Sequence, residues 1–390
     1  MRIVLTGGGT GGHIMPFETI IESLRSVQAQ KKHVLPQFID PETIEIYFVG
    51  VVTQEARDLF SSYSIPAFHI PSGKIRRYVS ALTIVDILFR LPYGILRALW
   101  RIWNIMPDVI ISKGGYGSIP TVIAAIFYRI PILLHESDVV PGKTNAFTMR
   151  FAAAITLGFS VAREYLSAWK HKLFVTGTPV RVASTSSNRS GAKAKFQIPD
   201  SEKVVLIMGG SQGARQINEA VLTLLPELIE QAAVIHIAGP KQFDAVSKVA
   251  SEILADSPRK ELYKVFPYLS DTMVTAFLAS DVAIIRAGAS TLAEIARFQI
   301  PSLIIPLASA ANDHQRKNAL AFEAAGAALV LDPDNVNPHL LKQSMFRLLS
   351  DESLRTTLTE NAALLDFPNA AHDIADLAIQ IASGFRPAKK

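Results

Sequence analysis

Three glycine-rich segments are the positions in this sequence where the backbone itself could do chemistry. Residues 7–13 read Gly-Gly-Gly-Thr-Gly-Gly-His, residues 114–118 read Gly-Gly-Tyr-Gly-Ser, and residues 209–214 read Gly-Gly-Ser-Gln-Gly-Ala. Glycine allows the backbone to approach a ligand closely, and the amides at a helix N-terminus attract anions. One such segment alone could equally be a tight connection between a strand and a helix. Because equivalent segments open both halves of the chain, we expect loops that bind the phosphates of a ligand.

The first segment also matches a dinucleotide-binding pattern, because Gly7, Gly9 and Gly12 are spaced as G-x-G-x-x-G. That interpretation needs an acidic residue at the end of the second strand. The corresponding stretch, residues 49–52, reads Val-Gly-Val-Val and has none. The sequence therefore disfavours dinucleotide binding.

His13 lies where the first glycine segment enters a predicted helix. The helix dipole disfavours an imidazolium ion there and lowers the pKa, which would leave the ring neutral and able to accept a proton. A histidine that only caps or packs is the more common case. His13 is therefore a candidate general base, with a structural role as the alternative.

A second polar constellation follows the apolar run at residues 281–286. Thr291 and Glu294 have the spacing of a capping box at the start of a helix. Glu294 could instead accept hydrogen bonds from both ribose hydroxyls of a nucleotide while helix amides hold its diphosphate. The spacing leaves these alternatives open. Residues 312–319 are suited to sugar hydroxyls, because amide side chains offer a donor and an acceptor together.

Metal chemistry finds little support in the composition. The chain has no cysteine, and its nine histidines include no pair at metal-ligand spacing. Asp332-Pro333-Asp334 resembles the metal-binding Asp-x-Asp motif, but Pro333 favours a turn that begins a loop. We therefore expect neither a metal site nor a cofactor.

The elements that must position these residues follow from the hydrophobic pattern. Short continuous apolar runs alternate with helix-like segments, which indicates parallel sheets covered by helices on both faces. The predicted strands are residues 2–6, 45–49, 109–112, 132–135, 204–208, 234–238, 281–286 and 302–306. The expected fold class is α/β, with two doubly wound Rossmann-like domains that hold a ligand in the cleft between them.

The chain of 390 residues is long enough for two domains of ordinary size. We expect an N-terminal domain at residues 1–177, a linker rich in Ser, Lys and Ala at residues 178–200, a C-terminal domain at residues 201–370 and a last helix within residues 371–390. The N-terminus lacks the pattern of a signal peptide. No stretch offers about 18 uncharged apolar residues, so no helix is expected to span a bilayer.

The net charge of +5 is concentrated in one region. Residues 70–130 contain eight Lys and Arg against two Asp, an excess larger than that of the whole chain. Such a region needs an anionic partner or a structural explanation. Nucleic acid is disfavoured as that partner, because the rest of the chain is nearly neutral and no binding motif occurs.

Part of this basic region, residues 75–106, could lie on a membrane. Arg90, Arg97 and Arg101 fall on one side of an ideal helix that is also rich in Leu, Ile, Phe and Trp, although Pro92 must break or kink it. Cationic residues among tryptophan and aliphatic residues suit anionic lipid. The alternative is a solvated arginine stripe on core helices, and the residues alone leave both open.

Taken in order, these motifs resemble the MurG family, the bacterial N-acetylglucosaminyltransferases that make lipid II for peptidoglycan. In the first half the matching residues are Gly8-Gly9-Thr10-Gly11-Gly12-His13 with Pro16, Gly114-Gly115-Tyr116 with Ser118 and Pro120, His135-Glu136, Pro141-Gly142 with Asn145, and Pro179-Val180-Arg181. In the second half they are Gly209-Gly210-Ser211-Gln212-Gly213-Ala214, Arg286-x-Gly288-Ala289-x-Thr291-x-x-Glu294, and His314-Gln315-x-x-Asn318-Ala319. Each motif alone is modest, whereas the ordered set is specific.

The resemblance implies a B-type glycosyltransferase fold whose last helix returns to the first domain. It implies that N-acetylglucosamine passes from UDP-N-acetylglucosamine, with inversion, to the 4-hydroxyl of the muramoyl sugar in undecaprenyl-diphospho-muramoylpentapeptide (lipid I to lipid II). It also implies a peripheral protein on the anionic cytoplasmic surface of the cell membrane.

The family motifs also imply roles for individual residues. His13 would be the catalytic base, Glu294 would bind the ribose, and Leu269 would lie in the segment that faces uracil. The implied contacts to UDP-N-acetylglucosamine are Thr10, Gly11, Gly12, Asp138, Arg181, Ser211, Leu269, Ala289, Ser290, Thr291, Leu292, Ala293, Glu294, His314 and Gln315. The implied contacts to the acceptor are Gly8, Gly9, Gly114, Gly115, Tyr116 and Ser118. Helix amides and Arg181 would stabilise the leaving diphosphate, so that no metal is needed in principle.

Two positions depart from the family pattern. The family usually has His-Glu-Gln-Asn, whereas this chain has His135-Glu136-Ser137-Asp138. Asp138 thus stands where an asparagine normally touches the sugar, and an ionised carboxylate can only accept hydrogen bonds. The usual Gly-Asn-Pro-Val-Arg has a threonine here, Thr178, with Arg181 retained.

Three other functions fit the same pattern. A UDP-sugar epimerase could share the architecture and would need no basic apolar face. A glycolipid-forming transferase would use a different acceptor. A non-catalytic protein could bind the nucleotide sugar without turning it over.

Overall fold

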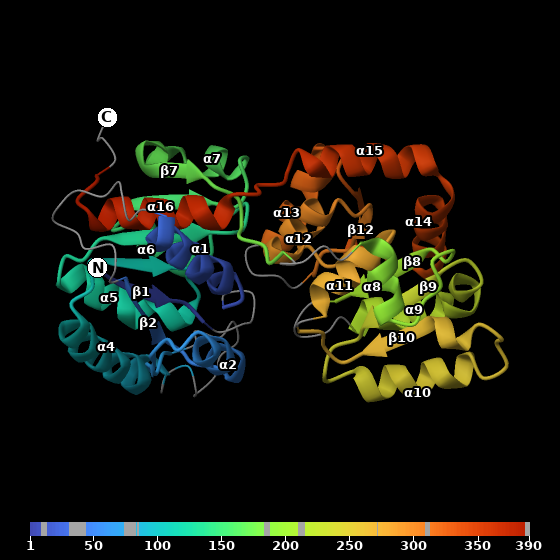
Figure 1. The fold of residues 1–390 in the computed structure, drawn as a ribbon, viewed down its shortest axis with the longest axis horizontal. Helices are drawn as coiled ribbons and strands as arrows, with labels where there is room; N and C mark the ends of the chain where they lie inside the picture. The colour runs from blue at the N-terminus through green and yellow to red at the C-terminus, as the bar shows by residue number, and fades with distance from the viewer. Residues whose placement is uncertain are drawn as a thin grey trace. The chain divides into compact units, whose positions relative to one another are not determined.

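The structure is a computed structural model that describes residues 1–8, 14–30, 44–73, 83, 86–182, 188–209, 215–270, 272–308 and 313–386. The chain forms two compact units (Figure 1). The first unit comprises Met1–Val180 together with Asn369–Lys390, and the second comprises Arg181–Pro368. The end of the chain therefore belongs to the unit in which the chain begins.

The first unit is built on a sheet of seven strands in the order β3-β2-β1-β4-β5-β6-β7, all of them parallel. The strands are β1 (Arg2–Thr6), β2 (Glu45–Gly50), β3 (Ala67–His69), β4 (Val109–Ser112), β5 (Ile132–Glu136), β6 (Ala154–Leu157) and β7 (Leu173–Val175). The order reverses between β1 and β4, and ligands bind beside such a point in open α/β sheets.

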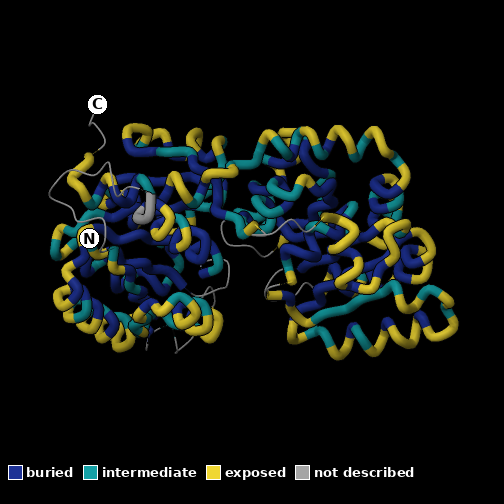
Figure 2. Tube along the Cα trace, in the orientation of Figure 1, coloured by how far each residue is buried: buried dark blue, intermediate teal, exposed yellow. Residues whose placement is uncertain are grey.

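Helices cover both faces of this sheet. The described helices are α1 (Pro16–Gln30), α2 (Gln54–Ser62), η3 (Asp86–Arg90), α4 (Leu91–Ile105), η4 (Tyr116–Ser118), α5 (Ile119–Phe127), α6 (Lys143–Met149), α7 (Ala162–Tyr165), η5 (Ser167–Lys172) and α16 (Ala370–Ala382). Side chains alternate along a strand. Ile3 and Leu5 of β1 therefore pack in one core with α1 and α16, whereas Val4 packs in another with α4 and α5. Figure 2 shows the strands as the buried layer of the unit.

The second unit repeats the plan with six parallel strands in the order β10-β9-β8-β11-β12-β13. The strands are β8 (Val204–Met208), β9 (Ala233–Ile237), β10 (Tyr263–Phe266), β11 (Val282–Ile285), β12 (Ser302–Ile304) and β13 (Leu329–Val330). The helices are α8 (Arg189–Lys195), α9 (Arg215–Ile229), α10 (Phe243–Ile253), η6 (Lys260–Leu262), α11 (Met273–Ala279), α12 (Ala289–Phe298), α13 (His314–Ala324), η8 (Pro333–Asn335), α14 (Pro338–Ser350) and α15 (Glu352–Ala363). Two Rossmann-like α/β domains with parallel sheets, the fold class expected from the sequence, are confirmed.

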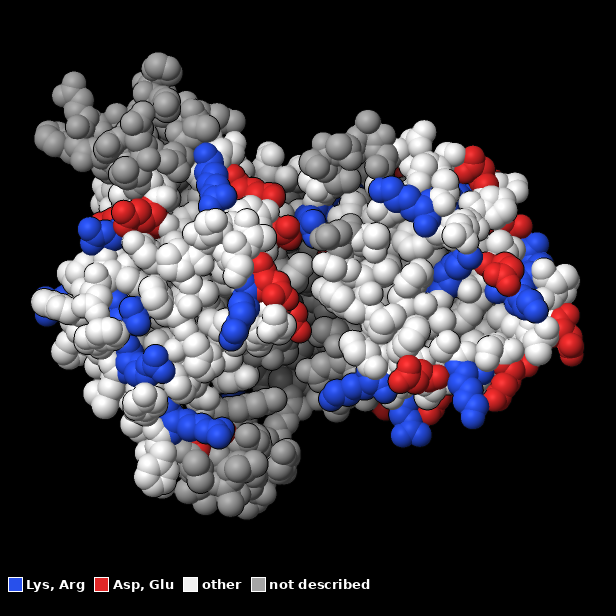
Figure 3. All heavy atoms as spheres, turned by 60° about the horizontal axis from the view of Figure 1, so that its bottom comes forward, with Lys and Arg blue, Asp and Glu red and all other residues white. Residues whose placement is uncertain are grey.

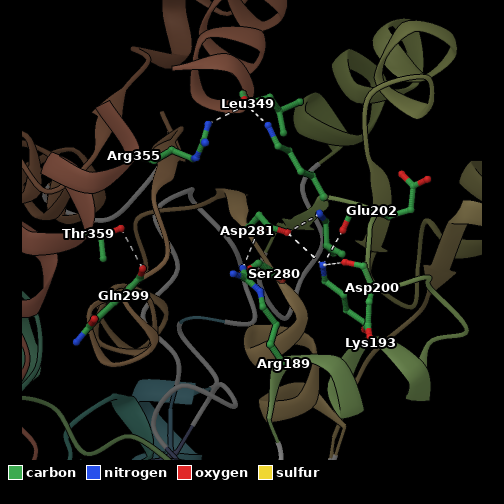
Figure 4. A network of polar contacts seen from close by, with 12 residues as sticks. Arg189, Lys193, Asp200, Glu202, Ser280, Asp281, Gln299, Leu349, Arg355 and Thr359 are labelled. Atoms are coloured by element: carbon green, nitrogen blue, oxygen red, sulfur yellow. Dashed lines mark hydrogen bonds and ion pairs between the residues drawn. The ribbon is translucent and has the colours of Figure 1, made fainter. Parts of the chain in front are cut away.

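The segment expected as a linker contains helix α8, which packs against α11. Arg189 forms an ion pair with Asp281 at 2.9 Å, and Lys193 Nζ donates to the carbonyl oxygens of Asp200 at 3.1 Å and Glu202 at 2.6 Å (Figure 4). Asp281 directly precedes β11, so these contacts lie at the amino ends of the strands. Arg189 and Lys193 thus fix α8 to the edge of the sheet that is opposite the expected ligand-binding edge. Residues 189–195 are therefore a helix packed on the second unit, and the expectation of a linker is wrong for them.

Helix α4 begins where Pro92 was expected to interrupt a helix. Pro92 lies in the first turn of α4, where a missing N–H removes no intrahelical hydrogen bond. The preceding turn, η3, is a π-helix in which the buried Asp86 accepts a hydrogen bond from Arg90 Nη1 at 2.9 Å. Pro92 therefore marks a helix start. Within the described part of the chain, no helix combines the length and the apolar content that crossing a bilayer requires.

Replacing Gly94 by Ala should destabilise the protein, because Gly94 is where α4 contacts the segment after β3. An added Cβ would lie 1.9 Å from the carbonyl oxygen of Pro71, a backbone atom that cannot rotate away. Overpacking costs up to about 3 kcal/mol and outweighs a gain of about 1 kcal/mol in helix propensity, for a net loss of about 2 kcal/mol. Chemical denaturation measures the loss. Gly142→Ala is the control, since nothing lies within 4 Å of its added Cβ; equal losses in both variants would contradict the contact.

Candidate active site

At the carboxyl ends of β1, β2 and β4, glycine backbones pack directly against one another. A Cβ on Gly8 would lie 2.9 Å from the carbonyl oxygen of Val51, and the φ of +127° at Gly8 favours glycine. A Cβ on Gly117 would lie 2.9 Å from the carbonyl oxygen of Gly7. Three loops thus meet in backbone contact, and any side chain larger than hydrogen would force them apart.

The loop between β4 and α5 contains Gly114, Gly115, Tyr116 and Ser118, which lie together in one turn. Gly114 has a φ of +81°, and a Cβ there would lie 1.9 Å from Oδ1 of Asn145. Ser118 donates to the carbonyl oxygen of Gly115 through both Oγ, at 2.9 Å, and its amide, at 3.1 Å. These bonds fix the turn directly before the first residues of α5, whose leading amides have no partner within the helix.

A charged cluster lies beside this loop, and we call it the Lys113 cluster. Its members Lys113, Glu136 and Asn145 are buried, and Ser137 and Asp138 are half-buried. Lys113 Nζ donates to Ser137 Oγ. Glu136 accepts two hydrogen bonds, from the Asp138 amide at 3.0 Å and from Asn145 Nδ2 at 2.8 Å. Lys113 was expected in a basic surface region, whereas its side chain is buried, and its association with Glu136 and Asn145 was therefore not predicted.

Burial moves the pKa values of the two oppositely charged members toward each other. It lowers the pKa of Lys113 to about 8, although the charges of Glu136 and Asp138 oppose the change. Burial and the charge of Asp138 raise the pKa of Glu136 to about 8, although its hydrogen bonds and Lys113 oppose the change. Each charge therefore depends on the other for its stability.

His135, next to this cluster, is a core residue. Its ring is buried, Nδ1 lies 2.9 Å from Thr156 Oγ1, and burial lowers its pKa well below 6.5. A histidine held neutral inside a sheet has a packing role.

Several other expected contacts lie outside the described residues: Gly9, Thr10, Gly11, Gly12, His13 and Ser211.

In the second unit, the start of α12 is not the capping box that the spacing suggested. The helix begins at Ala289 with Gly288 as its N-cap, and no side chain caps it. Thr291 is the third residue of the helix and does not occupy the cap position. Glu294 makes no hydrogen bond or ion pair with other described residues, and burial raises its pKa to about 8. The carboxylate is thus available to a ligand.

The first turn of α12 offers backbone amides, and its side chains contribute unequally. Ala289, Ser290 and Thr291 carry the amides that have no partner within the helix. Leu292 is fully buried, so only its backbone can contact a ligand, while Ala293 is half-buried. This turn combines a helix N-terminus with a nearby carboxylate, a combination that suits a phosphate joined to a sugar.

The side chains of Arg286 and Asn318 form hydrogen bonds with backbone carbonyl oxygens of the loops near this turn. Arg286 is buried and donates through Nη1 to the carbonyl oxygens of Ile305 at 3.0 Å and Pro306 at 2.8 Å. Burial lowers its pKa to about 10, so the guanidinium remains charged at neutral pH. Asn318 of α13 donates to the carbonyl oxygen of Ala287 at 3.1 Å. Both side chains therefore hold the loops that follow β11 and β12.

The other residues expected near the donor differ in what they can offer. Gln315 Oε1 accepts from the Leu307 amide at 2.9 Å, so its amide nitrogen is the part left for a sugar. His314 beside it is the first residue of α13. Leu269 is buried, so only its backbone can face a base. Arg181 is half-buried at the start of the second unit.

The Asp-x-Asp sequence is a structural turn. Asp332 caps the short helix η8 by accepting from the Asp334 amide at 3.0 Å, and Arg316 pairs with both carboxylates, at 3.2 and 3.1 Å. Counting only the residues that the structure describes, no group of three or more His, Asp and Glu side chains is arranged to hold a metal ion.

Comparison with known proteins agrees with this geometry. The N-terminal and C-terminal domains of glycosyltransferase family 28 match residues 3–157 and 204–375. A protein from Lachnospira eligens, named UDP-N-acetylglucosamine–N-acetylmuramyl-(pentapeptide) pyrophosphoryl-undecaprenol N-acetylglucosamine transferase, is 33% identical over 351 residues, which cover 90% of this chain and 91% of its own. The crystal structure of MurG from Acinetobacter baumannii aligns with a TM-score of 0.68 at 25% identity, covering 97% of this chain and 99% of that one.

A UDP-N-acetylglucosamine 2-epimerase from Neisseria meningitidis shares the fold, with a TM-score of 0.67 over 97% of this chain and 100% of its own, at only 14% identity. That likeness concerns architecture alone, whereas the relative from Lachnospira eligens is similar in sequence along nearly the whole chain. The family suggested by the ordered motifs is therefore confirmed: the chain belongs to glycosyltransferase family 28 and, within it, to the MurG family.

Proposed function

We propose that this protein transfers N-acetylglucosamine from UDP-N-acetylglucosamine to the 4-hydroxyl of the muramoyl sugar in undecaprenyl-diphosphate-linked muramoylpentapeptide. The observation that carries the proposal is the start of α12, where free helix amides stand one turn away from the unengaged, partly buried carboxylate of Glu294. Membership of the MurG family supports the choice of donor and acceptor, since the relative from Lachnospira eligens is named for this transfer.

The donor would bind to the second unit. Glu294 would accept hydrogen bonds from the ribose hydroxyls, and the amides of residues 289–291 would bind the diphosphate with Arg181 and Ser211. Gln315, with its amide nitrogen still available, and His314 would contact the sugar. Negative charge would develop on the leaving UDP, and the amides and the guanidinium of Arg181 would stabilise it. Because these groups are already in place, they need not reorganise during the reaction.

The acceptor would bind to the first unit. Its diphosphate would lie on the glycine loops after β1 and β4, with Gly8, Gly9, Gly114, Gly115, Tyr116 and Ser118 as contacts. The backbone packing at Gly8 and Gly117 supports this, because it brings the backbone of neighbouring loops together at the sheet edge. His13 would remove the proton from the muramoyl hydroxyl, which would attack the anomeric carbon opposite UDP and give a β-1,4 bond with inversion.

Helix α4 would hold the protein on the anionic cytoplasmic surface of the cell membrane. Six large apolar residues of η3 and α4 are more than half exposed, and we call them the α4 apolar face: Leu88, Phe89, Tyr93, Leu96, Trp100 and Trp103. Arg101 lies over the rings of Phe68 at 3.9 Å and Trp100 at 4.6 Å. In Figure 3, which brings this side of the first unit forward, Lys and Arg are set among uncharged side chains. Aromatic and aliphatic residues exposed beside cations favour a lipid partner over the solvated arginine stripe considered from the sequence.

The epimerase is the rival function that the shared fold suggests. An epimerase would act on the nucleotide sugar alone and would have no use for the α4 apolar face. The glycolipid-forming transferase would use that face but a different lipid acceptor. The identity of the acceptor is therefore the property that separates these functions. Nucleic acid is not proposed as a partner.

The transfer is tested by offering radiolabelled UDP-N-acetylglucosamine together with undecaprenyl-linked muramoyl peptide and a diacylglycerol. We expect label only in the undecaprenyl-linked product. Label in diacylglycerol would identify a glycolipid-forming transferase, epimerised donor in the absence of acceptor would identify an epimerase, and no turnover would leave only nucleotide-sugar binding.

Replacing His13 by Ala in the same assay should reduce turnover by about 10²–10⁴-fold, the usual contribution of a general base. Affinity for UDP should stay nearly unchanged, because the donor would bind to the second unit. Isothermal titration with UDP measures that affinity. Wild-type turnover in the variant would remove His13 from the mechanism.

UDP binding should depend on pH through Glu294. Ribose hydroxyls donate to the carboxylate, so binding favours the charged form and lowers a pKa that starts at about 8. The complex then holds fewer protons than the free protein, and affinity falls as the pH drops below that value. We expect affinity about tenfold weaker at pH 7 than at pH 9. Glu294→Gln should bind more weakly and lose this dependence; a pH dependence that persists in the variant would contradict the assignment.

The membrane proposal is tested by replacing Leu96 and Trp100 together with Glu and measuring co-sedimentation with vesicles of phosphatidylglycerol and phosphatidylcholine. Burying a large apolar side chain contributes about 1.5–3 kcal/mol, so the loss of two should weaken binding by tenfold or more. Leu364→Glu is the matched control, because this leucine of the second unit is 80% exposed. Equal effects of the two variants would exclude the α4 apolar face as the attachment site.

A further inference from the structure

Lys113 is a buried cation that the proposed transfer leaves without a role. Its side chain is only 2% exposed, at the end of β4. Lysines are almost never buried unless they are paired, because an uncompensated charge in the interior is costly. The charges of Glu136 and Asp138 favour the charged form of Lys113, and these two carboxylates are therefore its compensation.

A continuous chain of contacts joins Lys113 to the loop after β4. Lys113 Nζ donates to Ser137 Oγ, in the residue that follows Glu136. Glu136 accepts a hydrogen bond from Asn145 Nδ2 at 2.8 Å. Asn145 in turn packs so closely on Gly114 that a Cβ there would lie 1.9 Å from its Oδ1. A change of charge at Lys113 is therefore expected to alter the loop that begins at Gly114.

Asp138 makes this compensation necessary. The charge of Asp138 disfavours ionisation of the buried Glu136 and raises its pKa. When Lys113, Glu136 and Asp138 are all ionised, their net charge is −1; without the charge of Lys113, the two ionised carboxylates carry −2. An asparagine at position 138 would return the net charge to −1 in the absence of the lysine. Lys113 and Asp138 thus form a complementary pair.

We propose that Lys113 is a positioning residue for glycosyl transfer, and that its charge compensates Glu136 and Asp138 and so holds residues 114–118 and the Asp138 carboxylate in their working geometry. This inference rests on the proposed function, in which the loop at residues 114–118 contacts the acceptor, and on the family resemblance, which implies that Asp138 contacts the sugar.

The test is a double-mutant cycle between positions 113 and 138. The variants are Lys113→Gln, which removes the charge and keeps a hydrogen-bond donor, Lys113→Met, Asp138→Asn, and each lysine variant combined with Asp138→Asn. The matched control is Lys172→Gln, because Lys172 is also buried in the first unit but donates to the carbonyl oxygens of Met149 and Ala152. For each protein, kcat, the KM for the acceptor, UDP affinity and the free energy of unfolding are measured.

Both Lys113 variants should lose kcat/KM by about tenfold through a lower kcat and a higher acceptor KM, with UDP affinity unchanged. Adding Asp138→Asn should recover most of the lost kcat/KM, because it restores the net charge of the cluster. The free energies of unfolding should also show coupling between positions 113 and 138: Asp138→Asn should reduce the destabilisation caused by the Lys113 variants. Asp138→Asn should restore nothing in the Lys172→Gln background.

The pH profile gives a second readout that general destabilisation would not move. In Lys113→Gln, Glu136 loses the cation that favours its carboxylate, while Asp138 still raises its pKa. In a plot of kcat against pH, the fall in kcat on the acidic side should therefore occur at higher pH. Adding Asp138→Asn should move it back. His135, the other titratable neighbour of Lys113, is held neutral by burial.

Wild-type kinetics in both Lys113 variants, a loss that Asp138→Asn does not restore, or an equal loss of UDP affinity would each overturn the inference. If the wild-type protein itself failed to transfer the sugar, the proposed function would fail instead. The double-mutant cycle of unfolding free energies would then still show whether Lys113 and Asp138 compensate each other. If one lysine variant does not fold, the same cycle is measured with the other.

Discussion

Parallel pairing of the central strands determines where the loops of both candidate binding sites lie. β1 pairs with β4 so that Thr6 lies beside Ser112, and β8 pairs with β11 so that Met208 lies beside Ile285. Parallel strands end at the same sheet edge, so the loops after them must share that edge. In the first unit those loops can approach only where there is no side chain, as at Gly8 and Gly117. The same edge of the second sheet carries the start of α12 and, one turn along, Glu294.

The central strands could be predicted because they carry their own signal. The strands expected at residues 2–6 and 109–112 were found with those bounds, since a strand buried on both faces is a continuous apolar run. Among the described strands, β3, β6, β7, β10 and β13 were not predicted, and each has only two to four residues. Strands of that length depend on pairing with a neighbour and have too few residues to show a pattern of their own.

The position of a candidate motif could be predicted where the motif lies within one segment. The turns at residues 114–118 and 289–294 are local, and both lie at helix starts as expected. The Lys113 cluster could not be predicted in the same way, because Lys113, Glu136 and Asn145 meet only when β5 pairs with β4 and α6 packs behind them. Burial of a charge is a property of the fold, and composition therefore suggested a surface lysine. The capping box failed for a related reason, since Gly288 takes the cap position itself.

We propose that backbone amides at the start of α12 and the carboxylate of Glu294 bind the nucleotide. This claim can be tested with a crystal structure of the protein in complex with UDP-N-acetylglucosamine. We expect both ribose hydroxyls within hydrogen-bond distance of Glu294 and the diphosphate on the amides of residues 289–291. A nucleotide bound elsewhere, with Glu294 touching no part of it, would contradict the claim.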